Sequence, residues 1–260
     1  MLRIKFGNGL ILGQAPYQLQ SPIEGLDTPA IRNGNGLYAG ADGGFMVSQY
    51  YGYRTIVLKG FFIGDCAETT DELRKGLLSS LYMRYYSPIV IEDLADNYWF
   101  TQAYITDIKC ALTSLKAGEY QITLLCPDPI LYKCSSWNAN APEEIEVALV
   151  VNGDKTILRE GDADAFPIIE LNGEFTNPII TLGDYAFGLN LTTDSSSKIT
   201  IDMKSRRVYA SDGTSLAADR LIDSRWLFLS NGANTITITT EDNNDSGTAK
   251  LIYSAGYRGI

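Results

Sequence analysis

Short segments rich in β-branched and aromatic residues recur along most of this chain and constrain its fold more than any other feature. In 98–108, "YWFTQAYITDI", successive residues would point to opposite faces of a sheet, which is the two-residue period of a strand. Turn-forming Gly, Asn, Asp and Pro separate such segments. The pattern predicts a mainly β protein, with strands at 2–6, 55–64, 87–93, 98–108, 119–126, 145–151, 167–171, 177–183, 185–193, 198–203, 206–210, 225–229, 234–240 and 249–258.

One segment, residues 68–86, breaks this pattern. Its leucines recur at helical spacing and form a single apolar stripe, with acidic residues in the first turn. We therefore expect one helix that packs on a sheet, with Thr69 or Thr70 as its N-cap.

The stretch "ITLLCPDPILYKCSS", 122–136, marks a boundary between two domains. Pro127 and Pro129 interrupt the strand that precedes them, and the polar, turn-rich "SSWNANAPEE" follows. Beyond it, short strands at about 8–12-residue spacing indicate a sandwich or barrel. We expect an N-terminal domain of β-strands and one helix, a connecting segment and a C-terminal β-sandwich, at 1–135, 136–165 and 166–260.

Composition excludes several kinds of function. The chain contains no histidine, which removes Ser-His and Cys-His nucleophiles and His-bearing zinc sites. The four cysteines lack the paired short spacing of a zinc site, so we expect buried, unpaired thiols in a protein made in a cytoplasm. No uncharged apolar run approaches the roughly 20 residues that span a bilayer, and no signal peptide is expected at the start.

The net charge of −10 is unevenly distributed along the chain. Residues 1–135 hold 11 Lys and Arg against 13 Asp and Glu, whereas 136–260 hold 10 against 18. An acidic surface repels a phosphate backbone, which argues against sequence-specific binding of nucleic acid.

The short motifs of the chain predict no catalytic residue and no cofactor. "GNGLILG" (7–13) and "GNGLYAG" (34–40) have GxGxxxG spacing and no following helix, so we interpret them as turns rather than phosphate loops. "SSSK" (195–198) and "DSGT" (245–248) match catalytic patterns by chance and also lie in expected turns.

Two groups of residues are candidates for binding. Glu160, Asp162 and Asp164 alternate within an acidic stretch, so an extended chain would present three oxygen ligands to calcium on one side. A solvated charged face is the favoured interpretation, and no metal is predicted. The second group lies in "SQYYGYR" (48–54), whose aromatic content suggests an interface made by Tyr50, Tyr51, Tyr53 and Arg54.

Several phrases in a fixed order resemble the distal tail proteins (Dit) of siphovirus-like bacteriophages, the siphovirus tail component family. They are "GYRTIVLKGFFIG" (52–64), "YQITLLCPDPILY" (120–132), "FPIIELNGEFTNPIITLGD" (166–184), "KITIDMKSRRVYASDG" (198–213), "SNGANTITI" (230–238) and "YSAGYRGI" (253–260). This resemblance extends over nearly the whole chain.

The resemblance implies a non-enzymatic hub at the virion tail tip, or baseplate. The N-terminal domain, with its helix and an extended hairpin, would close as a homo-hexameric ring around a channel through which DNA passes without specific binding. The C-terminal domain would be a galectin-like or CBM-like β-sandwich. The implied partners are the tail tube protein, the tape-measure protein, the tail-associated or tail-fibre protein and receptor-binding proteins.

Two alternatives remain at this stage. A carbohydrate-binding protein would recognise host cell-wall polysaccharide through the C-terminal sandwich. The expected burial of Trp226 in strand 225–229 argues against this alternative, although Tyr185, Tyr209, Tyr253 and Tyr257 remain available. A glycosidase that uses two carboxylates has no positive support beyond the abundance of acids.

Overall fold

The computed structural model describes residues 2–81, 86–242 and 245–260 and is mainly β, as the alternating segments predict. The chain divides into two units, each with its own hydrophobic core. The N-terminal unit comprises Met1–Pro142 and Tyr257–Ile260, and the C-terminal unit comprises Glu143–Gly256. The last residues of the chain therefore return to the N-terminal unit.

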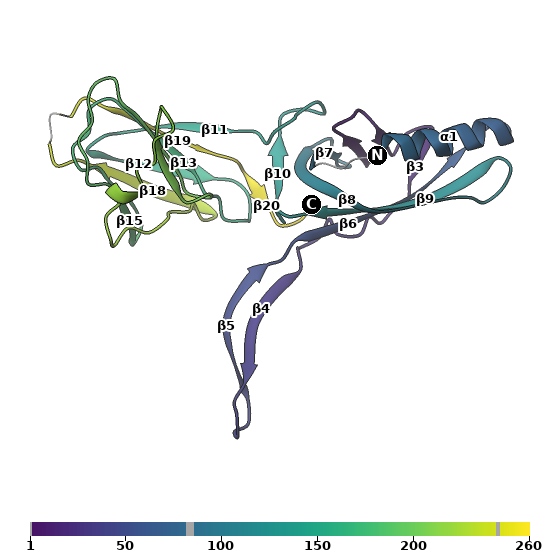
Figure 1. The fold of residues 1–260 in the computed structure, drawn as a ribbon, viewed down its shortest axis with the longest axis horizontal. Coiled ribbons are helices and arrows are strands. Elements are labelled where there is room, and N and C mark those ends of the chain that lie inside the picture. Colours follow the sequence, from purple (N-terminus) through teal and green to yellow (C-terminus); the bar gives the residue numbers. More distant parts are fainter. Residues whose placement is uncertain (1, 82–85, 243–244) are drawn as a thin grey trace. The chain divides into compact units, whose positions relative to one another are not determined.

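An antiparallel sheet in the order β2-β1-β7-β8-β9-β6-β3 forms the body of the N-terminal unit (Figure 1), and β10 pairs with β8 and β20 beside it. Buried aliphatic and aromatic residues from its strands form the core, because alternate side chains point to the same face. The bounds are β1 (Arg3–Phe6), β2 (Ile11–Leu12), β3 (Tyr17–Leu19), β6 (Arg54–Ile63), β7 (Ser87–Glu92), β8 (Tyr98–Leu112), β9 (Ala117–Cys126), β10 (Leu131–Cys134) and β20 (Gly256–Tyr257).

The expected helix is present as α1 (Ala67–Ser80), which contacts β6, β8 and β9 and buries Leu77. Its N-cap is Cys66, so the expectation of Thr69 or Thr70 is wrong by one turn. The hydroxyl of Thr69 instead accepts a hydrogen bond from the Cys66 backbone N–H at 3.1 Å, the reciprocal half of a capping box. Of the predicted residues beyond Ser80, 82–85 lie outside the described residues.

The C-terminal unit is a sandwich of two antiparallel sheets, in the orders β11-β19-β13-β16-β17 and β12-β18-β14-β15. Side chains from both sheets form one core, which includes Phe175 and Phe187. The bounds are β11 (Ile145–Leu149), β12 (Gly153–Arg159), β13 (Ile168–Asn172), β14 (Ile179–Leu182), β15 (Tyr185–Gly188), β16 (Lys198–Asp202), β17 (Arg207–Ala210), β18 (Gly232–Thr239) and β19 (Thr248–Tyr253).

The segment 136–165, expected to connect two domains, instead supplies an edge strand to each sheet of the sandwich. β11 pairs with β19 and β12 pairs with β18. The turn-forming and charged residues of this segment suggested a linker between domains. An edge strand, however, needs a pairing partner on one side only, so such a sequence can still form one.

Two other local predictions are wrong. Residues 34–37 of "GNGLYAG" are extended in a strand, because cross-strand pairing outweighs the turn preference of Gly and Asn. Residues 225–228 lie in no strand, and Trp226 is half-buried rather than buried. Of the cysteines, all four are unpaired, but only Cys126 and Cys134 are buried, whereas Cys110 is half-buried and Cys66 is exposed.

An ion pair between Arg3 on β1 and Glu92 on β7 stabilises the N-terminal sheet. Arg3 Nη2 donates to Glu92 Oε1 at 2.7 Å, and Arg3 Nε also donates to this carboxylate, whose side chain is 4 % exposed. Hydrogen bonding from Arg3 lowers the pKa of Glu92, and this effect exceeds the opposing effect of burial. A carboxyl group whose pKa is lowered by folding stabilises the fold above its unfolded pKa of about 4.3.

Glu92→Gln is therefore expected to lower the free energy of unfolding by about 1–3 kcal/mol at pH 7, since it leaves a polar partner poorly satisfied. The difference from the native protein should shrink as pH falls through the lowered pKa of Glu92, where the native carboxyl also becomes neutral. Urea titrations between pH 3 and 7 measure this effect, with the exposed Glu72→Gln as control. A difference that is independent of pH would contradict the charged pair as its source.

Candidate assembly surface

Residues between Ile31 and Tyr51 form a long hairpin that belongs to none of the three sheets described above. β4 (Ile31–Leu37) and β5 (Gly44–Tyr51) pair only with each other among the described strands, in a register that shifts between Gly34 and Asn35. Figure 1 shows this hairpin extending away from the sheet of the N-terminal unit. The ladder thus pairs only the inward-facing backbone groups of its two strands and leaves their outer edges and both faces of the ribbon uncovered by a further strand.

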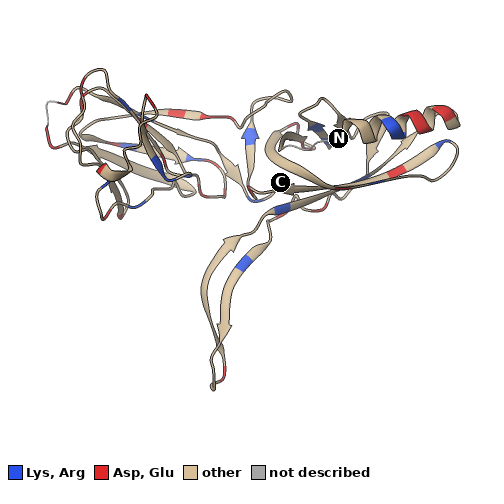
Figure 2. Cartoon of the chain, viewed as in Figure 1, with Lys and Arg blue, Asp and Glu red and all other residues tan. Residues whose placement is uncertain are grey.

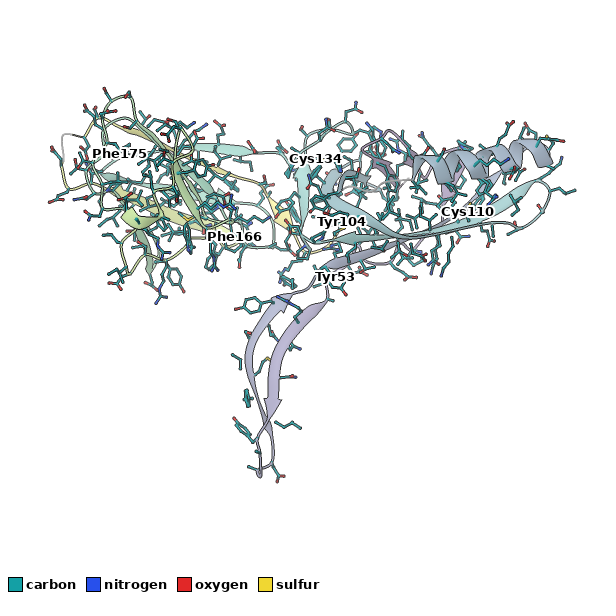
Figure 3. All side chains as sticks on the ribbon, in the orientation of Figure 1. Tyr53, Tyr104, Cys110, Cys134, Phe166 and Phe175 are labelled. Carbon is teal, nitrogen blue, oxygen red and sulfur yellow. The ribbon has the colours of Figure 1, made fainter. Side chains whose placement is uncertain are left out.

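The uncovered faces are apolar. Leu37 is 86 % exposed, Val47 75 % and Met46 58 %, and the adjacent positions of Met46 and Val47 place them on opposite faces of β5. Near the tip, the rings of Tyr38 and Phe45 lie with centroids 5.7 Å apart. Figure 3 shows the side chains of the hairpin standing out from the ribbon on both sides.

The hairpin is also almost free of charge. Between residues 28 and 53, Arg32 and Asp42 are the only charged residues in the sequence. Figure 2 shows the contrast with α1, which carries both acidic and basic residues. Few charged groups are therefore available on the hairpin to compensate, through their hydration, for the apolar surface that it exposes to water.

A two-stranded ribbon without a core is marginally stable in water, and large exposed apolar patches mark interaction sites. The geometry of the hairpin suits burial against another protein chain better than binding of a small molecule. Alternation did not reveal the hairpin, because apolar residues occur at consecutive positions in "FMV" (45–47) and two glycines interrupt the other strand. The sequence features that could have indicated an exposed hairpin were the consecutive apolar residues 45–47 and the turn-forming residues beside them.

The four predicted interface residues have two different environments. Tyr50 and Tyr53 are each 63 % exposed, on the hairpin and just after it. Tyr51 is half-buried, and its hydroxyl accepts a hydrogen bond from Arg258 Nη1 at 3.2 Å. Arg54 is 1 % exposed, so its placement in an interface is wrong for the described chain.

Arg54 instead connects three backbone segments at the base of the hairpin. Its Nε donates to Pro129 O at 2.7 Å, and Nη2 donates to Arg258 O at 2.6 Å. Its Nη1 donates to the carbonyls of Gly25 and Asp27, both at 2.6 Å. Burial lowers the pKa of Arg54, yet an arginine remains charged at physiological pH, so these are charge-assisted hydrogen bonds.

The weak calcium candidate gains no support from the described structure. Glu160, Asp162 and Asp164 are exposed and alternate with buried Ala163 and Ala165, as the extended pattern predicts. Within the described ranges, no group of three His, Cys, Asp or Glu residues is placed to hold a metal ion. The carboxylates share a side of the chain but do not converge on one point. In the same described ranges, no helix combines the length and apolar character that crossing a bilayer requires.

An exposed, largely apolar arm on a β-rich scaffold is typical of proteins that assemble with other chains. Residues 160–257 match the family model of the siphovirus-type tail component, C-terminal domain. No curated protein matches the chain. The resemblance to the siphovirus tail component family is confirmed over residues 160–257, which carry its C-terminal domain.

One solved structure shows the same fold over nearly the full length of the chain. The chain is similar to the crystal structure of Dit (gp 19.1) from phage SPP1, with a TM-score of 0.73, 15 % identity and coverage of 98 % of this chain and 99 % of that chain. The baseplate of phage P2, solved with Ca and with Sr, matches with a TM-score of 0.42, 9 % identity and coverage of 97 % and 98 %.

Proposed function

We propose that this protein is the structural hub of a phage or prophage tail tip. In this proposal six copies close into a ring that joins the tail tube and the tape-measure end to tail-associated, fibre or receptor-binding proteins and leaves a channel for DNA. The match of residues 160–257 to a tail component domain supports it. So does the likeness in fold to SPP1 Dit, which is described as a paradigm of a hub adsorption apparatus in phages that infect Gram-positive bacteria.

The observation that carries the proposal is the unpaired apolar hairpin β4–β5. A closed ring requires a heterologous interface, in which one surface of each copy contacts a different surface of the next. The hairpin supplies one such surface. The outer edge of β8 is a candidate for the other, because residues 106–112 pair with β9 alone among the described strands, and an open edge can accept a further strand.

The charge of the two units fits a structural role at a DNA channel. The N-terminal unit, proposed to form the ring, holds 12 Lys and Arg against 13 Asp and Glu, so its net charge is −1. The C-terminal unit holds 9 against 18 and has a net charge of −9. Neither unit has the basic excess that retains DNA. The proposed location is the virion tail tip, and the proposed role involves no catalysis.

Light scattering on the purified full chain, combined with negative-stain images of the same fractions, tests the ring. The expected mass is about 172 kDa, six times the 28.6 kDa of one chain, and the images should show a central hole. A monomer at every concentration, in the presence of the neighbouring tail proteins as well, would overturn the proposal.

A further inference from the structure

A small cavity opens on the C-terminal unit beside β17. Its volume is about 290 Å³, and it is lined by Arg206, Val208, Ala217, Arg220 and Trp226. This is the small end of the range of ligand pockets, which suits one sugar-sized unit rather than an extended chain. All five lining residues belong to the C-terminal unit, so the cavity is complete within it.

Trp226 forms one wall and orients an arginine. Its ring packs against Phe187 with centroids 4.9 Å apart, and the Arg220 guanidinium lies 5.4 Å from the Trp226 centroid. Cation–π contact of this kind restricts the guanidinium while leaving its N–H donors available. Arg220 is half-buried, so partial loss of water strengthens any charge-assisted hydrogen bond that it makes.

The two arginines of this cavity are not neutralised by an acidic side chain in the described structure. The C-terminal unit has a net charge of −9, yet across the described ranges neither Arg206 nor Arg220 forms an ion pair with a carboxylate. By contrast, Lys198 and Lys250 both lie within 3.5 Å of Glu170. An acidic domain that leaves two guanidiniums unneutralised at one cavity has a local preference for an anion there.

The backbone conformation of Arg206 also supports a binding role for this residue. Its φ is 58°, a left-handed backbone that Gly or Asn adopts at lower energy than an arginine. The turn before β17 therefore gains nothing in stability from arginine at this position, and among the described residues no ion pair of Arg206 explains its presence. A role for the guanidinium in binding does explain it.

We propose that this cavity binds a saccharide that carries an oxyanion, either a phosphate or a carboxylate. The guanidiniums of Arg206 and Arg220 would hold the anion through paired N–H donors, and Trp226 would fix Arg220 and provide an apolar wall for the sugar. Charges spaced by neutral sugar units suffer less repulsion from the acidic unit than the dense charge of DNA does. The site is independent of ring formation, but its use against a bacterial surface rests on the proposed function.

The chain contains a closely matched control for Arg220. Arg225 lies in the same irregular segment, with its guanidinium also 5.4 Å from an aromatic centroid, that of Tyr185, but it does not line the cavity. Replacing either arginine by glutamine removes one charge and one cation–π contact. Only the Arg220 substitution alters the proposed site.

Isothermal titration calorimetry on the full chain tests the proposal with glucose 6-phosphate, glucuronate, glucose, inorganic phosphate and a DNA oligonucleotide. We expect the two anionic sugars to bind more tightly than glucose or free phosphate, and their ratio identifies the favoured oxyanion. Arg220→Gln should weaken binding by about 10-fold or more, and Arg225→Gln by less than about 2-fold. Arg206→Asn should weaken binding while keeping or raising Tm, because it relieves the left-handed backbone.

Equal binding of glucose and the anionic sugars would overturn the proposal, as would equal effects of the Arg220 and Arg225 substitutions. Tighter binding of DNA than of the sugars would also overturn it in favour of a nucleic-acid contact. The mass of each sample, measured by light scattering, separates this result from the ring proposal. A protein that binds through Arg220 but stays monomeric, with the neighbouring tail proteins present as well, would refute the ring and retain the site.

Discussion

Replacing Leu37, Met46 and Val47 with serine is expected to convert the proposed hexamer into monomers without lowering the Tm of the monomer. These side chains are between 58 % and 86 % exposed, so the folded monomer loses little when they are shortened. In a ring they would be buried against the next copy, where three such side chains contribute roughly 4–9 kcal/mol per interface. Each 1.4 kcal/mol is tenfold in affinity, so a loss of this size removes the ring at micromolar concentrations.

A matched control is available on the same chain. Leu94, Leu115 and Ile222 are 79 %, 76 % and 97 % exposed, and they lie outside the hairpin. Their replacement with serine removes a similar amount of exposed apolar surface and should leave the hexamer intact. Light scattering of both triple variants at equal concentration measures the difference. A hexamer that survives the hairpin substitutions, or that is lost equally in the control, would show that the hairpin does not form the interface.

Arg54→Met is expected to destabilise the N-terminal unit by about 3–5 kcal/mol, because it leaves several buried carbonyls without a donor. The guanidinium donates to the carbonyls of Gly25, Asp27, Pro129 and Arg258, and methionine fills the volume but donates nothing. Urea titration of the full chain measures the loss. Hydrogen–deuterium exchange should rise first at 24–27 and 257–260, the segments that Arg54 connects.

Two further variants separate charge from geometry at this position. Arg54→Lys keeps the charge but has no planar fork, so it should recover part of the stability and not all of it. Arg32→Met removes an exposed arginine from β4 and should change the free energy of unfolding by less than about 0.5 kcal/mol. Equal stability of the Arg54→Met and Arg32→Met proteins would contradict the proposed role of the buried guanidinium.

The regular strands and the helix could be predicted because local sequence determines them. In β6, for example, every second residue from Arg54 to Phe62 is buried. Hydrophobicity that alternates with a period of two residues indicates that one face of the strand is buried. This signal does not depend on which sheet the strand joins. The leucines of α1 report its packed face in the same way.

Trp226, Arg54 and the hairpin required the tertiary structure. The apolar pattern of "RWLFL" indicates that part of the segment is buried, and Leu227 and Leu229 are, but no described strand pairs with residues 225–228. Arg54 looks like a surface residue in the sequence, since only the folded chain brings its four carbonyl partners together from three distant segments.

The sequence by itself therefore determined the β class, the single helix, the change of texture near residue 136 and the resemblance to phage tail proteins. These features depend on residue period and local composition, which neighbouring residues define. Only the tertiary structure decided that 31–51 is an uncovered arm, that Arg54 is buried, and that two arginines meet Trp226 at one cavity. Each of these depends on contacts, or on their absence, between residues far apart in the chain, and local hydrophobic period does not encode such contacts.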